Sequence, residues 1–580
     1  MSVTLFKQKS LYQKIQNLFA NGEPGFWLDP SDLSTMYQTV DGVTPVTAVE
    51  QPVGLILDKS QGLVLGADLV SNAADRNFTS NTGFWTLDSG GVTISGNAVN
   101  WASTAATFQF YRNGLVPVGK YCEITYTISS ISGQLRAHCG ANLGAIRTAP
   151  GTYTDRILGD GGLAGIISVG ASTTASVTSV SFKPIAGTHY YQSTAGVRPV
   201  LSARVNGLIK TEDFSNAAWV KSGTGTPVSV TVNAGVAPDG TNTAALIYPS
   251  ASAPAGTYLI QSVSVIAGAT RQICIAKAAG ISCIWMYANT GAAYGIYYLN
   301  LITGVSQVVA GSTATGAITS SPLGNGWYSF AYTNNLPSGT YNVGIGVCDA
   351  NGSVSVTKSG TNGILIWNPD VRPSDQATGL IPTYQRVNTS TDYDTASFPL
   401  YLSGNGTQWM QCATQDYTGV NKMLVCAGVR KRSDAAASVL LELSTIVTNA
   451  GTFAIYAPNS PGEYVFPLNG TALSGQIATT FNAPITNVLS VAYDISQASA
   501  ALETIPRVNG ATPTLALFGA ASAGTGNFGN YPAYLFCRAG TSLFLTGNIY
   551  GLVARGSTVA SNAAQIAATE NWTDSKCRAY

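Results

Sequence analysis

Short runs of apolar, β-branched and aromatic residues, separated by glycine-rich turns, cover most of the chain from residue 66 onward. The runs 105–111, 121–128 and 175–182 are examples. Alternation of apolar and polar positions with a period of two indicates a strand with one buried face. Charged residues supply only 10% of the chain, so strong helix formers such as Glu and Lys are scarce. The pattern predicts an all-β fold of tandem β-sandwich (jelly-roll) domains, preceded by a short N-terminal helix and an irregular segment.

The charge balance excludes several classes of partner. The 29 Lys and Arg nearly match the 28 Asp and Glu, which argues against a basic nucleic-acid-binding surface. No apolar run is long enough to span a bilayer, and the first residues lack the apolar core of a secretory signal peptide. We therefore expect synthesis in a reducing cytoplasm, without nucleic acid or membrane insertion. The nine cysteines, an odd number without CxxC pairs, are expected to be buried thiols.

Residues 1–22 carry the clearest helical pattern. Leu11, Ile15, Leu18 and Phe19 fall on one helical face, and the sequence Asn-Gly that follows is a typical helix stop. Two interpretations of this helix remain open. It either packs on the next domain of the same chain, or it docks as a peg into a larger assembly.

Residues 23–65 are rich in turn residues, which leaves room only for short strands. The strings FWLDPSD at 26–32, DGVTPV at 41–46 and LDKS at 57–60 resemble a segment near the start of tail proteins from tailed bacteriophages and prophages. The resemblance implies a virion role in which residues 1–65 bind other virion proteins. It supplies no catalytic residues. The predicted virion-attachment residues are Leu11, Ile15, Leu18, Phe19, Phe26 and Trp27.

Residues 66–190 and 211–387 each resemble a carbohydrate-binding-like β-sandwich module of such tail proteins, and 191–210 reads as a linker. The second match rests on strings in the expected order: TEDFSNAAW at 211–219, APDGT at 237–241, YLNL at 298–301, GNGWY at 324–328, IW at 366–367 and IPTY at 381–384. The strings LVSN at 69–72 and FW at 84–85 echo the start of the second module. We interpret the two modules as a diverged tandem repeat.

Residues 388–580 form a third strand-rich unit. The string GNIYGLVAR at 547–555 and the closing segment 564–572 resemble the end of a concanavalin-like (laminin-G-type) jelly roll. The Asp- and Gly-rich opening that is usual in this family reads SGNGT at 403–407 here. This departure from the family pattern supports no calcium or sugar site at that position.

Residues suited to catalysis are few. His138 and His189 are the two histidines, and no nucleophile elbow accompanies them. Jelly-roll hydrolases carry closely alternating carboxylates, whereas Asp392 and Asp394 lie in a stretch that we interpret as a polar linker. The GTGNFG string at 524–529 precedes Asn-Tyr-Pro, so we expect a loop and not a dinucleotide site. We predict no catalytic residue, no metal site and no cofactor.

Aromatic side chains are the remaining candidates for binding. Trp285 and Tyr287 share one face of a predicted strand, and further tyrosines follow it. Aromatic rings stack on sugars as well as on one another, so core or intersubunit packing is the alternative. The predicted glycan-contact residues are Trp285, Tyr287, Tyr294 and Tyr297. Three tryptophans at matching module positions are assigned to the core: Trp219, Trp327 and Trp367.

Together these features favour a non-enzymatic structural protein of a tailed-bacteriophage virion, of the tail-fibre or spike type. The resemblance further implies a homotrimer and contact with host surface glycans. Two alternatives stay open: a head-decoration or head-fibre protein, and a tail spike that depolymerises capsule polysaccharide. A secreted lectin or adhesin is disfavoured by the missing signal peptide.

Overall fold

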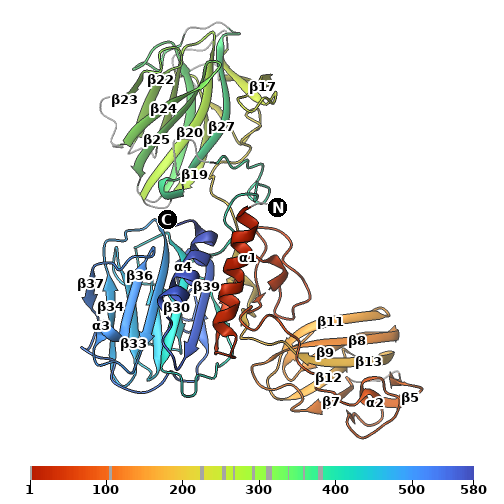
Figure 1. The fold of residues 1–580 in the computed structure, drawn as a ribbon. Coiled ribbons are helices and arrows are strands. Elements are labelled where there is room, and N and C mark those ends of the chain that lie inside the picture. Colours follow the sequence, from red (N-terminus) through yellow and green to blue (C-terminus); the bar gives the residue numbers. More distant parts are fainter. Residues whose placement is uncertain are drawn as a thin grey trace. The chain divides into compact units, whose positions relative to one another are not determined.

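The chain folds almost entirely into β-sheets, which confirms the all-β tandem-sandwich prediction. It forms two compact units, Met1–Ser202 with Pro399–Asn482 and Thr486–Tyr580, and Ala203–Phe398 with Ala483–Ile485 (Figure 1). The computed structural model describes residues 3–102, 107–170, 172–222, 228–250, 256–265, 268–289, 294–308, 316–336, 339–356, 360–376 and 383–579.

The first unit contains a sandwich of two large sheets, which we call the base sandwich. Its seven-stranded sheet has the order β15 (Val200–Ser202), β28 (Tyr401–Asn405), β39 (Thr546–Ser557), β30 (Lys422–Lys431), β35 (Ile485–Asp494) and β36 (Thr504–Val508), with β1 (Gly25–Leu28) on β39. Its ten-stranded sheet has the order β2 (Met36–Tyr37), β3 (Leu55–Ile56), β14 (Tyr190–Tyr191), β29 (Met410–Cys412), β38 (Ala533–Leu535), β31 (Val439–Leu443), β32 (Thr452–Tyr456), β33 (Tyr464–Asn469), β34 (Leu473–Ala478) and β37 (Leu515–Leu517).

Three separate stretches of the chain build the base sandwich. The segment 23–65 supplies β1, β2 and β3, and the stretch 190–202 supplies β14 and β15. Leu28 is paired with Leu552, and Tyr190 lies between Ile56 and Cys412. The predicted boundaries differ from this division, because 23–65 and 190–202 both contribute strands to the base sandwich. The largest core cluster contains side chains from all three stretches, among them Phe26, Leu28, Met36, Val46, Val53, Ile56, Tyr190, Leu201, Leu402 and Val425.

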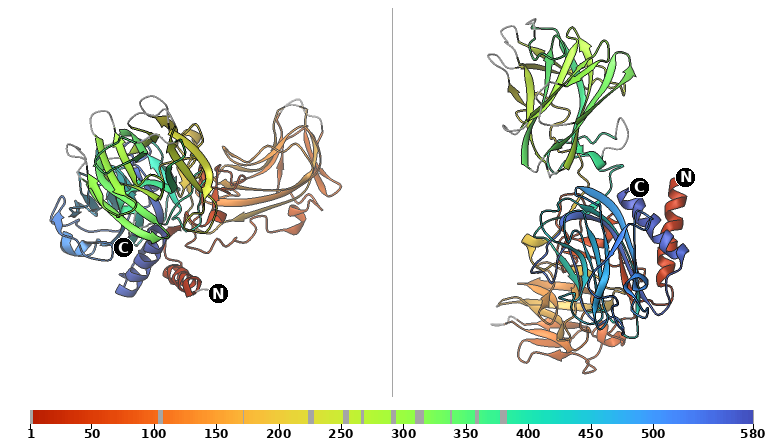
Figure 2. Two further views of the ribbon diagram at one scale, coloured as in Figure 1. Left: turned by 90° about the horizontal axis from the view of Figure 1, so that it is seen from above. Right: turned by 90° about the vertical axis from the view of Figure 1, so that its left-hand side faces the viewer.

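Helices cover the outer face of the seven-stranded sheet. α1 (Val3–Gln16) and α4 (Ala563–Cys577) lie side by side there, as Figures 1 and 2 show. α4 begins with a capping box between Asn562 and Gln565, which satisfies free backbone N–H groups of its first turn. The short helices among the described residues are η1 (Asn17–Phe19), η2 (Leu33–Thr35), α2 (Ala73–Arg76), η3 (Ala195–Val197), η4 (Ser374–Gln376) and α3 (Ala500–Glu503).

Two smaller sandwiches are inserted into the base sandwich, and we call them the first module (66–189) and the second module (203–398). The sheets of the first module have the orders β10 (Asn142–Leu143), β9 (Leu135–Cys139), β12 (Leu163–Ser168), β7 (Gln109–Asn113), β4 (Thr86–Leu87), and β11 (Gly151–Leu158), β8 (Tyr121–Ser132), β13 (Thr174–Pro184), β6 (Ala98–Trp101), β5 (Val92–Ser95). Those of the second have the orders β23 (Ser306–Val308), β22 (Tyr294–Asn300), β21 (Cys283–Asn289), β26 (Gly339–Cys348), β19 (Tyr258–Val265), β16 (Val220–Ser222), and β24 (Gly316–Gly324), β25 (Trp327–Leu336), β20 (Gly268–Ala279), β27 (Gly363–Pro373), β18 (Ala244–Pro249), β17 (Val228–Gly235).

The two modules share one strand order, which supports the interpretation of a tandem repeat. When the strands are read in sequence, β4 to β10 correspond to β16 to β22, and β11, β12 and β13 correspond to β25, β26 and β27. The tryptophan before the first strand is equivalent as well. The indole N–H of Trp85 donates to the carbonyl of Asp75, and that of Trp219 donates to the carbonyl of Lys210, both at 2.9 Å.

A buried amide network closes the end of the second module where the chain enters and leaves it. Gln385 Oε1 accepts the N–H groups of Val205 and Asn206 at 2.8 and 3.0 Å. The Gln385 Nε2 donates to the carbonyls of Ala203 and Asp394, each at 2.9 Å. Residues 203–210, predicted as part of a linker, are therefore held by hydrogen bonds to the segment around Gln385, where the chain leaves the module.

Replacing Gln385 by Ala is expected to destabilise the second module by about 2–4 kcal/mol. The substitution leaves two N–H groups and two carbonyls without this partner in a buried position. Hydrogen exchange at increasing urea concentration, read on peptides from β20 and β27, measures the change. Gln307→Ala on the exposed strand β23 is the matched control and should stay within about 0.5 kcal/mol. Equal effects of the two variants would contradict the role of the network.

Candidate functional site

A buried ion-pair cluster joins the N-terminal segment, at the strings 26–32 and 57–60, to α4. Lys59 Nζ lies 3.1 Å from Asp29 Oδ2 and 2.6 Å from Asp32 Oδ2. Lys576 Nζ lies 3.1 Å from the same oxygen of Asp29 and donates to Ser31 Oγ at 2.6 Å. Burial alone would raise the pKa of Asp29, but the charges of Lys576 and Lys59 outweigh it and hold the pKa below its usual value. The ion pairs of this cluster therefore link the N-terminal segment to the C-terminal helix α4.

Asp58 forms a second group of buried polar contacts in the same region, through hydrogen bonds. Its carboxylate accepts the backbone N–H groups of Trp27, Ser60 and Thr188 at 2.7, 2.8 and 2.7 Å, and the Ser60 hydroxyl at 2.7 Å. Its own N–H donates to Nδ1 of His189 at 2.9 Å. Burial raises the pKa of Asp58 to about 6, although these donors oppose the rise. One side chain thus connects β1 to the end of the first module. We refer to Asp58 and the Lys59 cluster together as the N-terminal clasp.

The predicted virion-attachment residues are directed into the protein. Ile15, Leu18, Phe19 and Trp27 form a small core with Val553 and Trp572, and Leu11 packs against it. Phe26 lies in the core of the base sandwich. This arrangement matches the interpretation in which the helix packs on its own chain. A contact to other proteins through this segment therefore has to use the outward side of α1, where Ser10, Gln13 and Lys14 are exposed.

The predicted glycan-contact residues fall on both faces of one sheet of the second module. Trp285 and Tyr287 lie on the outer face, over the glycines Gly344 and Gly346 of β26, which leave room for flat rings. Only 3% and 8% of these two residues are exposed, so their rings contact one another and offer little free surface. Tyr297 points into the core and stacks on Tyr332, with ring centroids 3.8 Å apart. The side chain of Tyr294 lies outside the described residues.

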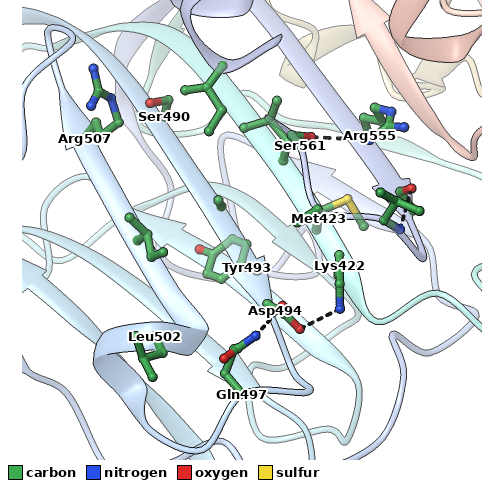
Figure 3. Close-up of a pocket in the computed structure, with 17 residues that line it drawn as sticks. Lys422, Met423, Ser490, Tyr493, Asp494, Gln497, Leu502, Arg507, Arg555 and Ser561 are labelled. Carbon is green, nitrogen blue, oxygen red and sulfur yellow. Dashed lines mark hydrogen bonds and ion pairs between the residues drawn. The ribbon is translucent and has the colours of Figure 1, made fainter. Parts of the chain in front are cut away.

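A cavity of about 320 Å³ opens on the face of the seven-stranded sheet that carries α4 (Figure 3). Its charged residues are paired within the chain. Lys422 lies 3.0 Å from Asp494, Arg507 lies 2.7 Å from Glu570, and Arg555 lies 2.9 Å from Glu23. The rest of the lining combines aliphatic side chains, among them Leu424, Leu502, Ile505, Val559 and Ile566, with the uncharged polar side chains of Ser490, Tyr493, Gln497, Ser557 and Ser561. The cavity is suited to an uncharged group, because binding an ion there would require one of these pairs to open.

Three sequence-based interpretations, for Asp394, for the string at 524–529 and for the cysteines, hold at the level of local structure. Asp394 forms an ion pair with Arg386 in a half-exposed turn, as expected of a polar connection. The string at 524–529 is a loop. All nine cysteines are buried free thiols. Among the described residues no group of three or more His, Cys, Asp and Glu could hold a metal ion, and no helix is long and apolar enough to cross a membrane.

Both histidines are buried and give the structure a dependence on pH. Burial lowers the pKa of His138 and of His189 to about 4, from an ordinary value of 6.5. Protons therefore bind these histidines in the unfolded state more readily than in the folded state. The contribution of the neutral histidines to the free energy of unfolding is complete above pH 6.5 and is lost as the pH falls through 4. The raised pKa of Asp58 acts in the opposite sense, because its protonation favours the folded state.

We expect the free energy of unfolding of the first module to fall by about 2–3 kcal/mol between pH 7 and pH 4 because of His138 alone. Urea midpoints of the wild-type protein and of His138→Gln, measured at both pH values, isolate this contribution. The variant should lose that part of the pH dependence. An identical pH profile for the two proteins would contradict a neutral, buried His138.

No family model matches the sequence, and no curated protein matches it.

Proposed function

We propose that this protein is a non-enzymatic structural component of a tailed-bacteriophage virion, of the tail-fibre or spike type. The observation that carries the proposal is the position of the phage-like strings at the N-terminal clasp. FWLDPSD and LDKS supply Asp29, Asp32, Asp58 and Lys59, which fasten both chain ends and the first module to the base sandwich. A base sandwich to which both chain ends and the first module are linked by buried polar contacts is suited to a structural component with a fixed position in a virion.

In this proposal the base sandwich is attached to the virion, and the outward side of α1 is the contact that residues 1–65 supply. The two modules are the parts that reach the host. Each would contact surface glycans weakly, and a homotrimer carrying repeated modules would add such contacts through multivalency. The aromatic face around Trp285 and Tyr287 is the starting surface for these contacts once a ligand displaces the packed rings.

Purified intact particles test the proposal. Quantitative mass spectrometry should find the chain at a fixed copy number, in a multiple of three for trimers, and labelling with antibodies should place it on the tail. Label on the capsid would assign it to the head-fibre class instead. Absence from washed particles, or release of reducing ends from host capsule polysaccharide, would overturn the structural assignment.

A further inference from the structure

Two cysteines of the second module lie directly opposite each other on neighbouring strands. Cys283 begins β21, and Cys348 ends β26, which is antiparallel to it. Directly opposite residues of an antiparallel pair have Cα atoms about 4.5–5.5 Å apart, within the range that disulfides span. Both side chains point to the outer face of the sheet, in one cluster with Trp285 and Tyr298. A covalent link between the sulfurs therefore needs no displacement of either strand.

The surroundings of this pair favour a reactive sulfur. The interaction with the Cys348 side chain lowers the pKa of Cys283 to about 7, although burial and the charge of Asp349 oppose this shift. Both cysteines are buried at the end of the sheet, and the neighbouring Asp349, where a small oxidant would approach, is exposed. Burial raises the pKa of the seven cysteines outside this pair: Cys122, Cys139, Cys274, Cys412, Cys426, Cys537 and Cys577.

We propose that Cys283 and Cys348 are an oxidation site that forms a reversible disulfide across β21 and β26. With hydrogen peroxide as oxidant, the Cys283 thiolate attacks one peroxide oxygen, giving a sulfenic acid and hydroxide. The Cys348 sulfur then attacks the sulfenic sulfur, and water leaves as the disulfide forms. Two thiols are oxidised, and one peroxide is reduced to two waters. The link joins the two central strands of this sheet and closes a long loop, which stabilises the second module.

The timing of this oxidation rests on the proposed function. A chain made in a reducing cytoplasm and released in a particle would meet an oxidising exterior, and the disulfide would form after release. Whether the pair can close does not depend on that role, because it is a property of the purified chain.

The experiment uses the purified full chain, treated with hydrogen peroxide or with a reductant and then alkylated. Residues 278–357 contain no Lys or Arg, so trypsin, which cuts after Lys277 and Lys358, leaves both cysteines in one peptide without any other cysteine. After oxidation this peptide should take up no alkylating reagent, weigh two hydrogens less, and split into linked fragments with chymotrypsin. The Tm of the second module should rise by roughly 5–10 °C.

Cys274 lies in the main core of the same module and in a different tryptic peptide, so it is the internal control and should stay a thiol. Cys348→Ser should leave Cys283 unlinked and remove the rise in Tm. Full alkylation of both cysteines after oxidation, or links to Cys274 or to a second chain, would overturn the proposal. If the disulfide forms in the purified chain but the chain is absent from particles, the proposed function fails and the oxidation site stands.

Discussion

Deletion of residues 23–65 is expected to abolish folding of the base sandwich. The deletion removes three strands and six core side chains: Phe26, Leu28, Met36, Val46, Val53 and Ile56. Burial of each contributes about 1.5–3 kcal/mol, so the loss is on the order of 10 kcal/mol or more. A typical domain has only about 5–15 kcal/mol of stability in total.

Soluble expression and the near-ultraviolet circular dichroism of the deleted protein measure this effect. We expect aggregation, or a chain whose base sandwich gives no fixed aromatic signal while the second module stays folded. A soluble, fully folded product that merely fails to join a particle would contradict the structure. It would also restore the interpretation of 1–65 as a separate attachment segment.

Replacing Asp58 by Ala is expected to lower the free energy of unfolding of the first unit by about 3–6 kcal/mol. Its carboxylate accepts three backbone N–H groups in a fully buried position, and each unpaired donor costs about 1–3 kcal/mol. Asp58→Asn keeps one acceptor oxygen and should recover part of the loss. Urea unfolding, followed by the fluorescence of the buried Trp27 and Trp572, measures the change.

Asp416→Ala is the matched control for the Asp58 variants. Asp416 is an exposed carboxylate that accepts the N–H of Thr418 within its own turn, at 3.0 Å. Its removal should change the free energy of unfolding by less than about 1 kcal/mol. If Asp58→Ala were as mild as this control, the clasp would not hold the segment in place.

Composition and strand periodicity were sufficient to predict the fold class, and similar strings near the starts of the two modules indicated the repeat. Long alternating strands such as β8 and β13 carry their own signal, and so does the apolar face of α1. Trp219 and Trp327 are buried as expected, whereas Trp367 is only half-buried. These features depend on residues close together in the sequence, so they can be predicted without knowing which distant strands pair.

The construction of the base sandwich could not be predicted, for a physical reason. β2, β3 and β14 have only two residues each, too few for a periodic pattern, and β14 pairs with β29 more than two hundred residues later. The cavity could not be predicted either, because Lys422 and Asp494 come together only through the pairing of distant strands. The burial of Asp29 and Lys59 could not be predicted, because charged residues are mostly exposed in folded proteins.

The most direct test of this construction removes the second module. Ser202 and Tyr401 are opposite each other on β15 and β28, so Asn-Gly in place of residues 203–400 would form a two-residue hairpin turn between them. The excised protein should be soluble and should unfold at a urea midpoint close to that of the first unit in the full chain. Failure of the excised protein to fold would contradict the claim that the module is an insertion in a base sandwich built from both ends of the chain.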